Sequence, residues 1–238
     1  MKITSFEAFK ELARRGTFVP VCKEIVADLL TPVSAFLKIA EHADYAFLLE
    51  SVEGGEHVGR YSFLGKDPFL ILRSHDGKTT IDRSGTTTAS DQPFIQTLRR
   101  LMADFRSPFV PDLPRFTGGA VGYLAYGAAQ WFEPSVGDIG GGAGDDRGKG
   151  TPGSSDRGKG APGSSVDGSD PAGFMLFDTV LAFDHVQHRI LIIANARVTA
   201  DEDLESLYQF ACAKIQFLER ELERNLSKTE RPAADGVD

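Results

Sequence analysis

Three side chains that could hold a free amino acid stand close together early in the chain. Glu50 and Ser51 end an apolar run that begins at Tyr45, and Arg60 follows a loop that contains glycine. The carboxylate of Glu50 can pair with an ammonium group, while the Ser51 hydroxyl and nearby backbone amides can take a carboxylate. Arg60 would add positive charge on the carboxylate side. These residues therefore predict a site for a zwitterion, with Tyr61 or neighbouring phenylalanines as an apolar wall.

A simpler interpretation of the same residues stands beside this one. Any antiparallel sheet contains strands that end in polar residues before a solvated glycine turn. On composition alone that structural interpretation is the stronger one, so the zwitterion site needs support from the rest of the chain.

Other candidate sites are weaker. Lys149 lies in a Gly-Lys-Gly sequence, but Gly follows it instead of Ser or Thr and no strand precedes it, so no phosphate loop is predicted. His185 and His188 are three residues apart in a predicted hairpin turn, where their side chains would diverge. Asp178 and Asp184 flank an apolar strand and are predicted to be loop-end residues. No catalytic residue and no metal ligand is assigned.

Composition indicates a globular protein and disfavours several functions. Of the 238 residues 41% are hydrophobic and 17 are Phe, which is typical of a packed core. A formal net charge of -8 disfavours nucleic-acid binding, which requires clustered Lys and Arg. Only Cys22 and Cys212 occur, which favours a reducing compartment. The N-terminus lacks the apolar core of a signal peptide, and no apolar run is long enough to span a membrane, so a cytoplasmic protein is predicted.

Hydrophobic spacing predicts alternating groups of helices and strands. Helices are expected over 5–15, from Thr31-Pro32 onward, over 91–105 and over 201–226. Strands are expected over 45–50, 59–65, 68–74 and 78–82, and then over 174–184 and 189–196.

Several local details make these predictions more specific. The sequence from Thr4 to Glu7 has the pattern of a capping box, and Thr31 has the chemistry of a helix N-cap. Val33, Phe36 and Leu37 would form one apolar face of the second helix. Asp76-Gly77 predicts a tight hairpin turn.

The segment 137–170 differs from the rest of the chain. It has almost no apolar residues and contains a ten-residue unit twice, at 146–155 and 156–165. Such a composition cannot offset its chain entropy by burial, so a disordered Gly/Ser/Pro-rich insertion is predicted. The polar tail 227–238 is predicted to be a linker or a frayed end.

The remaining residues, 1–136 and 171–226, are expected to form one α+β lobe. Hairpin-length connections and single helices between runs of strands indicate mainly antiparallel sheets with flanking helices.

Four motifs resemble those of one enzyme family, anthranilate synthase component I. The segment 45–65 resembles its LLES…GRYSF hairpin, and 18–34 resembles its opening PV…TPVS segment. The segment 116–123 resembles its GGxVGY strand, while 177–185 and 193–196 resemble its FDTVLVFDH…ANA hairpin. The motifs occur in the family's order and extend over nearly 200 residues.

The resemblance implies a fold, an activity and partners. The family's N-terminal lobe is a sandwich of sheets that senses L-tryptophan as a feedback inhibitor. Glu50, Ser51 and Arg60 occupy the matching inhibitor hairpin. The complete enzyme converts chorismate and ammonia derived from glutamine to anthranilate and pyruvate in tryptophan biosynthesis. A glutamine amidotransferase subunit, component II, supplies the ammonia.

The resemblance does not extend to the family's catalytic half. That chorismate-binding half carries a Mg²⁺ site, and no segment of this chain resembles its motifs, so no cofactor is expected in this chain. A truncated or split chain that is inactive alone is therefore expected. Two alternatives stay open, namely component I of aminodeoxychorismate synthase in the folate pathway and a free-standing amino-acid-binding module.

Overall fold

The computed structural model describes residues 3–26, 30–50, 59–132 and 171–224. They form two compact units, each built on one five-stranded antiparallel sheet. Unit 1 comprises Met1–Asp67, Arg106–Gly118 and Asp178–Asp238, and unit 2 comprises Pro68–Phe105 and Gly119–Phe177.

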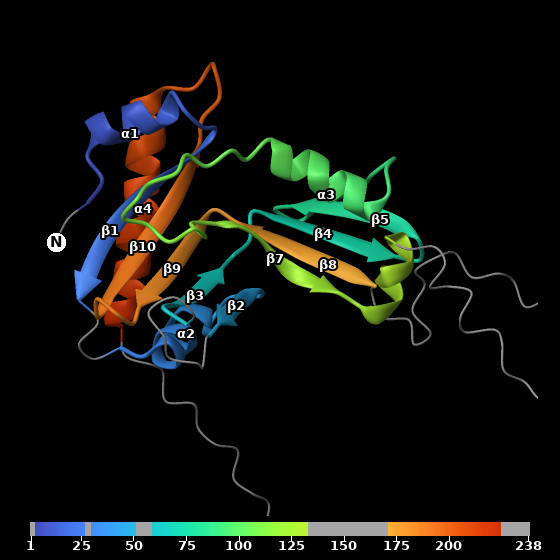
Figure 1. Ribbon diagram of the computed structural model, residues 1–238, viewed down its shortest axis with the longest axis horizontal. Coiled ribbons are helices and arrows are strands. Elements are labelled where there is room, and N and C mark those ends of the chain that lie inside the picture. The colour runs from blue at the N-terminus through green and yellow to red at the C-terminus, as the bar shows by residue number, and fades with distance from the viewer. Residues whose placement is uncertain (1–2, 27–29, 51–58, 133–170, 225–238) are drawn as a thin grey trace, which may run out of the picture. The chain divides into compact units, whose positions relative to one another are not determined.

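Unit 1 is built on sheet A, whose strands follow the order β1-β10-β9-β3-β2 (Figure 1). These strands are β1 (Phe18–Val26), β10 (Arg189–Arg197), β9 (Thr179–Asp184), β3 (Tyr61–Lys66) and β2 (Ala46–Leu49). Within β10 every residue except the two terminal ones is buried. Its isoleucines suit this position because β-branched side chains pack well on a pleated surface.

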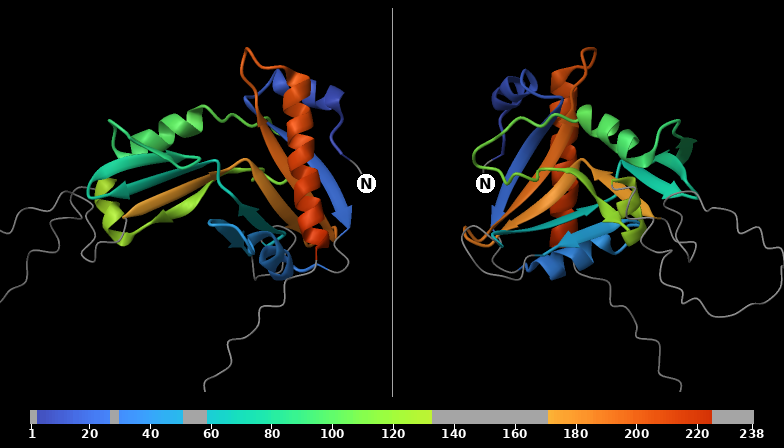
Figure 2. Two further views of the ribbon diagram at one scale, coloured as in Figure 1. Left: turned by 180° about the vertical axis from the view of Figure 1, so that it is seen from behind. Right: turned by 45° about the vertical axis from the view of Figure 1, so that its right-hand side comes forward.

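Three helices cover one face of sheet A, namely α1 (Phe6–Ala13), α2 (Pro32–Ala40) and α4 (Leu204–Glu223). Helix α4 packs on β10 and β1, and Figure 2 shows it lying lengthwise along the sheet. The core between helices and sheet includes Val21, Leu64, Leu181, Ile192 and Ile215, all fully buried. Because side chains alternate along a strand, the neighbours of these strand residues lie on the other face.

The predicted starts of α1 and α2 differ in outcome. Thr31 is the N-cap of α2 and forms a capping box with Ser34, which confirms the prediction. The predicted capping box at Thr4 is wrong by one residue, since the Ser5 hydroxyl accepts the hydrogen bond from the Ala8 amide. Thr4 is engaged elsewhere, because its hydroxyl accepts a hydrogen bond from the Cys22 amide at 3.0 Å.

Of the apolar face predicted for α2, only Phe36 packs against the core, where it is partly buried. Pro32, Ala35 and Ile39 are buried, whereas the side chains of Val33 and Leu37 are 46% and 52% exposed. The nine-residue helix is apolar around most of its circumference, so spacing alone cannot select the inner face.

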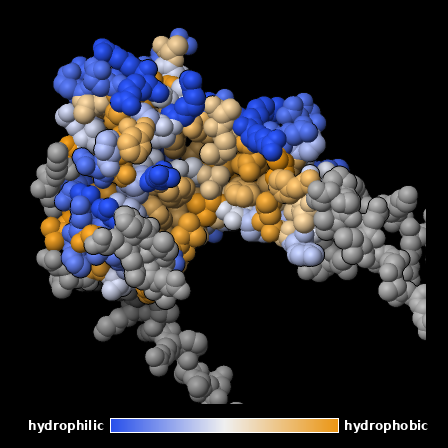
Figure 3. All heavy atoms as spheres, viewed as in Figure 1, coloured by the Kyte–Doolittle hydropathy of each residue, from blue (hydrophilic) through white to orange (hydrophobic). Residues whose placement is uncertain are grey.

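Unit 2 is built on sheet B, whose strands follow the order β6-β5-β4-β8-β7. These are β6 (Thr86–Ala89), β5 (Lys78–Arg83), β4 (Leu70–His75), β8 (Ala172–Phe177) and β7 (Gly119–Leu124). Helix α3 (Phe94–Ala103) and the 3₁₀ helix η1 (Tyr126–Trp131) complete the unit. The outward faces of α1 and α3 are hydrophilic (Figure 3), which accords with the burial of Phe9 in α1 and Phe94 in α3.

Glycine is required by geometry at two places in unit 2. The predicted β4–β5 turn is confirmed, with φ angles of 48° at Asp76 and 71° at Gly77. Both angles lie in the left-handed region that a tight hairpin turn of this type demands. In β7, a Cβ atom at Gly122 would overlap the Gly173 carbonyl and lie 2.6 Å from the Phe174 Cα. The GGxVGY glycine at 122 therefore allows β7 and β8 to approach closely.

One predicted strand is two strands. The stretch predicted as a single strand over 174–184 divides after Phe177, so that β8 pairs in sheet B and β9 pairs in sheet A. The polar pair Asp178-Thr179 marks this division in the sequence, but strands also tolerate single polar residues, so the break was not recognised. The strands β1 and β6 were not predicted, whereas the hairpin between β9 and β10 is confirmed.

The predicted α+β class with antiparallel sheets and flanking helices is confirmed. The predicted insertion at 137–170 and the predicted tail at 227–238 lie outside the described residues. That both units together act as one regulatory lobe stays a prediction.

Candidate ligand-binding site

The hairpin that carries the predicted site residues forms as expected. Strands β2 and β3 pair in antiparallel register from Ala46 opposite Lys66 to Leu49 opposite Phe63. One residue further along this register places Glu50, which is exposed, opposite Ser62. Ser51 lies outside the described residues. Glu50 therefore lies at the loop end of the hairpin, where it follows β2 and Arg60 precedes β3.

Arg60 is held by a partner that sequence analysis did not identify. Its Nε donates to Oδ1 of Asp184 at 3.0 Å, and its Nη2 donates to Oδ2 at 2.7 Å. The Asp184 side chain has no exposed surface, whereas that of Arg60 is 32% exposed. The guanidinium also lies over the Tyr61 ring, 4.9 Å from its centroid. A two-bond contact of this kind fixes the plane of the guanidinium. Only the Nη1 edge then stays available for a ligand.

Asp184 belongs to a row of alternating charges across four chain segments of sheet A. Glu24 of β1 accepts a hydrogen bond from Nη1 of Arg189 of β10 at 2.7 Å. The Nε of Arg189 lies 3.5 Å from Oδ2 of Asp184 of β9, which in turn holds Arg60 at the start of β3. This charge row, Glu24–Arg189–Asp184–Arg60, alternates in sign, so each inner charge has opposite charges on both sides.

The turn after β9 also stabilises the ionised form of Asp184. The amides of Val186 and Gln187 each donate to its Oδ1 at 3.2 Å. Burial opposes ionisation, but the hydrogen bonds from Arg60 and from these two amides outweigh it and lower the pKa of Asp184 below its ordinary value. Asp184 is the last residue of β9 before the turn, as predicted, and its carboxylate also holds Arg60 at the end of the sheet, which the sequence did not indicate.

An aromatic wall lies beside the charge row. The ring centroids of Tyr61 and Phe63 are 5.9 Å apart, and Phe116 packs edge-on against Phe63 at 5.3 Å. Phe47 of β2 joins this group with its centroid 6.4 Å from that of Phe116. Strand alternation puts Phe47 and Phe63 on the face of sheet A away from the helices, because Leu64 packs in the helical core. Aromatic surface therefore lies beside the guanidinium of Arg60, and its role as a wall for a ligand stays a prediction.

A Ser–His pair in the same region is not a hydrolytic centre. The Ser62 hydroxyl and Nε2 of His185 are 2.8 Å apart. Ser62 has no exposed surface, so no substrate can reach its oxygen. Asp184 is committed to Arg60 and to two backbone amides, so it does not complete a triad with this pair.

The described residues do not fit a metal site, since they contain no group of three His, Cys, Asp or Glu side chains that could hold an ion.

None of the helices in the described ranges is long and apolar enough to cross a membrane.

Comparison with known proteins supports the family resemblance. No protein-family model matches the chain. Anthranilate synthase component 1 from Synechocystis is 37% identical over 222 residues, which is 92% of this chain and 39% of that protein. This chain is related to anthranilate synthase component 1. It spans about two fifths of the length of the curated relatives it matches.

Further relatives carry the same name. Anthranilate synthase component 1 from Acetivibrio thermocellus is 34% identical over 92% of this chain and 39% of that protein. Anthranilate synthase component 1 from Acinetobacter calcoaceticus is 32% identical over 92% of this chain and 40% of that protein. Among solved structures, anthranilate synthase component I from Streptococcus pneumoniae matches with a TM-score of 0.43 and 20% identity, covering 82% of this chain and 36% of that one.

Proposed function

We propose that this chain is the N-terminal, tryptophan-sensing lobe of an anthranilate synthase component 1. The observation that carries the proposal is similarity to proteins of that name over 92% of the chain. The β2–β3 hairpin supports it, because exposed Glu50 and the guanidinium of Arg60, which Asp184 holds over the Tyr61 ring, flank the loop that connects the two strands.

Each proposed site residue has a distinct role. Glu50 pairs with the ammonium group of L-tryptophan, and the Ser51 hydroxyl takes part of its carboxylate. Arg60 adds positive charge through its Nη1 edge, since Asp184 occupies the other edge. The indole rests on apolar surface of the kind that Tyr61 and Phe63 supply.

The lobe would regulate a reaction that another part of the enzyme catalyses. We assign the conversion of chorismate and ammonia to anthranilate and pyruvate to a chorismate-binding half, with ammonia supplied by a glutamine amidotransferase subunit. Mg²⁺ would belong to that half, since the described residues offer no ligand set for it. Tryptophan bound in the lobe lowers turnover only if it binds more tightly to the less active arrangement of the enzyme.

Titration calorimetry tests the binding roles. The chain, together with its catalytic half, is titrated with L-tryptophan as wild type and as Glu50→Gln and Ser51→Ala. Loss of one charge-assisted hydrogen bond to a ligand lowers affinity by about tenfold or more. Glu11→Gln is the matched control, because the Glu11 side chain is 68% exposed on α1. Equal affinity of all four proteins for tryptophan contradicts the assigned roles.

A kinetic readout separates sensing from simple binding. Ammonia-dependent anthranilate formation is followed by anthranilate fluorescence at increasing tryptophan concentrations. Glu50→Gln is expected to keep the uninhibited rate and to need a higher tryptophan concentration for inhibition. An enzyme that forms aminodeoxychorismate instead of anthranilate would overturn the tryptophan-pathway assignment.

A further inference from the structure

One buried donor in the charge row has no hydrogen-bond partner. The Nε atom of Arg189 is buried, and no acceptor among the described residues binds it. Oδ2 of Asp184 lies 3.5 Å from it, beyond the usual N–H···O distance of about 3 Å. Because buried N–H groups are nearly always paired, an unpaired one requires an explanation.

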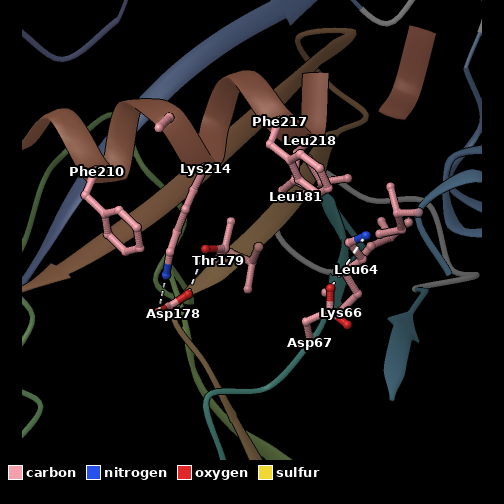
Figure 4. A pocket seen from close by; sticks show the side chains of 14 residues that line it. Leu64, Lys66, Asp67, Asp178, Thr179, Leu181, Phe210, Lys214, Phe217 and Leu218 are labelled. Carbon is pink, nitrogen blue, oxygen red and sulfur yellow. Dashed lines mark hydrogen bonds and ion pairs between the residues drawn. The ribbon is translucent and has the colours of Figure 1, made fainter. Parts of the chain in front are cut away.

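Cations on the opposite face of sheet A are matched by carboxylates. In the groove between α4 and the strands β3 and β9, the ammonium of Lys214 donates to Asp178 (Figure 4). Lys66 lines the same groove and pairs with Glu221 at 2.8 Å. These pairs give no reason to expect a charged ligand in the groove. The charge row differs, because one of its cations, Arg189, keeps an unused donor.

Two guanidinium groups share one carboxylate in the charge row. Oδ1 of Asp184 accepts from Nε of Arg60 and from the amides of the turn after β9. Oδ2 accepts from Nη2 of Arg60 at 2.7 Å and lies 3.5 Å from Nε of Arg189. The single negative charge of Asp184 is therefore divided between two cations, and the shorter contact goes to Arg60.

This division leaves positive charge on Arg60. Arg60, Asp184 and Arg189 together carry two positive charges and one negative charge, which is an excess of one positive charge. Glu24 offsets part of it, but it binds Nη1 of Arg189 and is 43% exposed, so water and salt screen it. The side chain of Arg189 is 16% exposed and that of Arg60 is 32% exposed. A ligand therefore meets the excess charge at Arg60.

We propose that Arg189 is a positioning residue for the ligand carboxylate that Arg60 binds. Arg189 attracts part of the charge of Asp184, so the guanidinium of Arg60 is not fully neutralised and its Nη1 edge attracts a carboxylate. Asp184 fixes the plane of that guanidinium, and Arg189 sets how much charge it presents. The inference rests on the proposed function, because it takes L-tryptophan as the ligand of Arg60.

A purely structural role of Arg189 has different consequences for binding. If Arg189 only joins β10 to β1 and β9, its loss weakens the binding of every ligand at the hairpin to the same extent. If Arg189 sets the charge on Arg60, its loss weakens only the ligands that carry a carboxylate. A pair of ligands that differ in the carboxylate alone therefore separates the two roles.

Calorimetry on the chain together with its catalytic half makes this comparison with L-tryptophan and tryptamine. Tryptamine has the same ring and ammonium group but no carboxylate. Arg189→Gln is expected to weaken L-tryptophan binding about twofold to fivefold, as for a partly screened charge, and to leave tryptamine binding unchanged. Arg189→Lys keeps the charge without the planar guanidinium and is expected to bind L-tryptophan as wild type does. If tryptamine binds too weakly to measure, the difference between these two variants decides.

A variant at the other end of the charge row tests the direction of the effect. Glu24→Gln removes the negative charge that offsets Arg189, so L-tryptophan affinity is expected to rise by about 1.5-fold to twofold. Arg14→Gln is the matched control for the loss of one positive charge. The Arg14 side chain is 74% exposed on α1, outside the charge row, so this variant is expected to bind both ligands as wild type does.

Several results would overturn the proposal. They are an equal loss of affinity for both ligands in Arg189→Gln, unchanged L-tryptophan affinity in that variant, and an equal loss in Arg189→Gln and Arg189→Lys. The proposed function survives each of them as long as wild type binds L-tryptophan and Glu50→Gln weakens that binding. A wild type that does not bind L-tryptophan refutes both. Circular dichroism checks the fold of each variant, and if Arg189→Gln does not fold, the sign of the Glu24→Gln effect decides.

Discussion

Replacing Asp184 by asparagine tests whether the charge row holds sheet A together. Asn keeps the shape of the side chain but removes its charge and turns one oxygen into a donor. Asp184 has no exposed side-chain surface and accepts from both Nε and Nη2 of Arg60. The substitution therefore places an amide N–H opposite a guanidinium N–H at a position where the side chain of residue 184 has no exposed surface.

The expected loss of stability follows from these contacts. At least one of two charge-assisted hydrogen bonds disappears, which costs about 1.5–3 kcal/mol. Arg189 also loses the carboxylate that lies 3.5 Å from its buried Nε. Removal of one partner of a buried ion pair costs about 3–5 kcal/mol, and partial exposure of Arg60 places the expected value at the lower end, about 3 kcal/mol.

Urea unfolding followed by far-ultraviolet circular dichroism measures this loss. Three of the four α-helices in the described ranges belong to unit 1, so the signal reports mainly on the unit that contains the charge row. Asp44→Asn is the control, because Asp44 is exposed. A double-mutant cycle with Arg60→Ala should give a coupling of about 2 kcal/mol between positions 60 and 184. A free energy of unfolding within about 0.5 kcal/mol of wild type at pH 7 would refute the reasoning.

The same pair predicts a pH dependence with a definite sign. The pKa of Asp184 is lower in the folded chain than its ordinary value. Its contribution is therefore fully present above the unfolded pKa of about 3.9 and is lost as the pH falls through the folded pKa. The stability difference between wild type and Asp184→Asn should stay constant above about pH 5 and shrink in more acidic solution. A difference that grows on acidification contradicts the assignment of charge to Asp184.

Three further predictions concern caps, close approach and thiol chemistry. Thr31→Ala removes the N-cap of α2 and should lower the free energy of unfolding by about 1 kcal/mol in thermal melts; no change would show that the cap is not needed. Gly122→Ala should lower the free energy of unfolding of unit 2 by about 1–3 kcal/mol, because the added Cβ overlaps the Gly173 carbonyl. Unfolding is followed by the fluorescence of the single tryptophan. Gly127→Ala, with open space at its Cβ, is its control and should melt as wild type does. Burial raises the pKa of the Cys22 thiol to about 12, so the reactive thiolate is scarce at pH 8. Iodoacetamide should therefore not label Cys22 in the native protein until urea is added. Rapid labelling of Cys22 without urea would contradict its burial.

Features that depend on a few adjacent residues could be predicted from the sequence. The Asp76-Gly77 turn follows from the ease with which both residues adopt positive φ. The N-cap of α2 follows from Thr31 before a proline, and the β9–β10 hairpin follows from a short polar connection between apolar runs. In each case the signal lies within about six residues.

Features that depend on contacts between distant parts of the chain could not be predicted from the sequence. Arg60 and Asp184 are separated by 124 positions in the sequence. Their side chains meet because β3 pairs with β9. No property of either residue alone identifies the other. An apolar strand end followed by an acidic residue is common, so the nearest signal in the sequence was too weak to separate a buried carboxylate from a solvated one.

The order of strands in sheet A has a consequence for synthesis of the protein. β10 lies between β1 and β9, yet Glu24 and Arg189, which pair across β1 and β10, are 165 residues apart. Until β10 has been synthesised, β1 lacks its partner strand, and the side chains of Val19 and Val21 stay exposed to solvent. A nascent chain that stops before residue 189 would leave β1 detached, and we expect such products to aggregate or to be captured by chaperones.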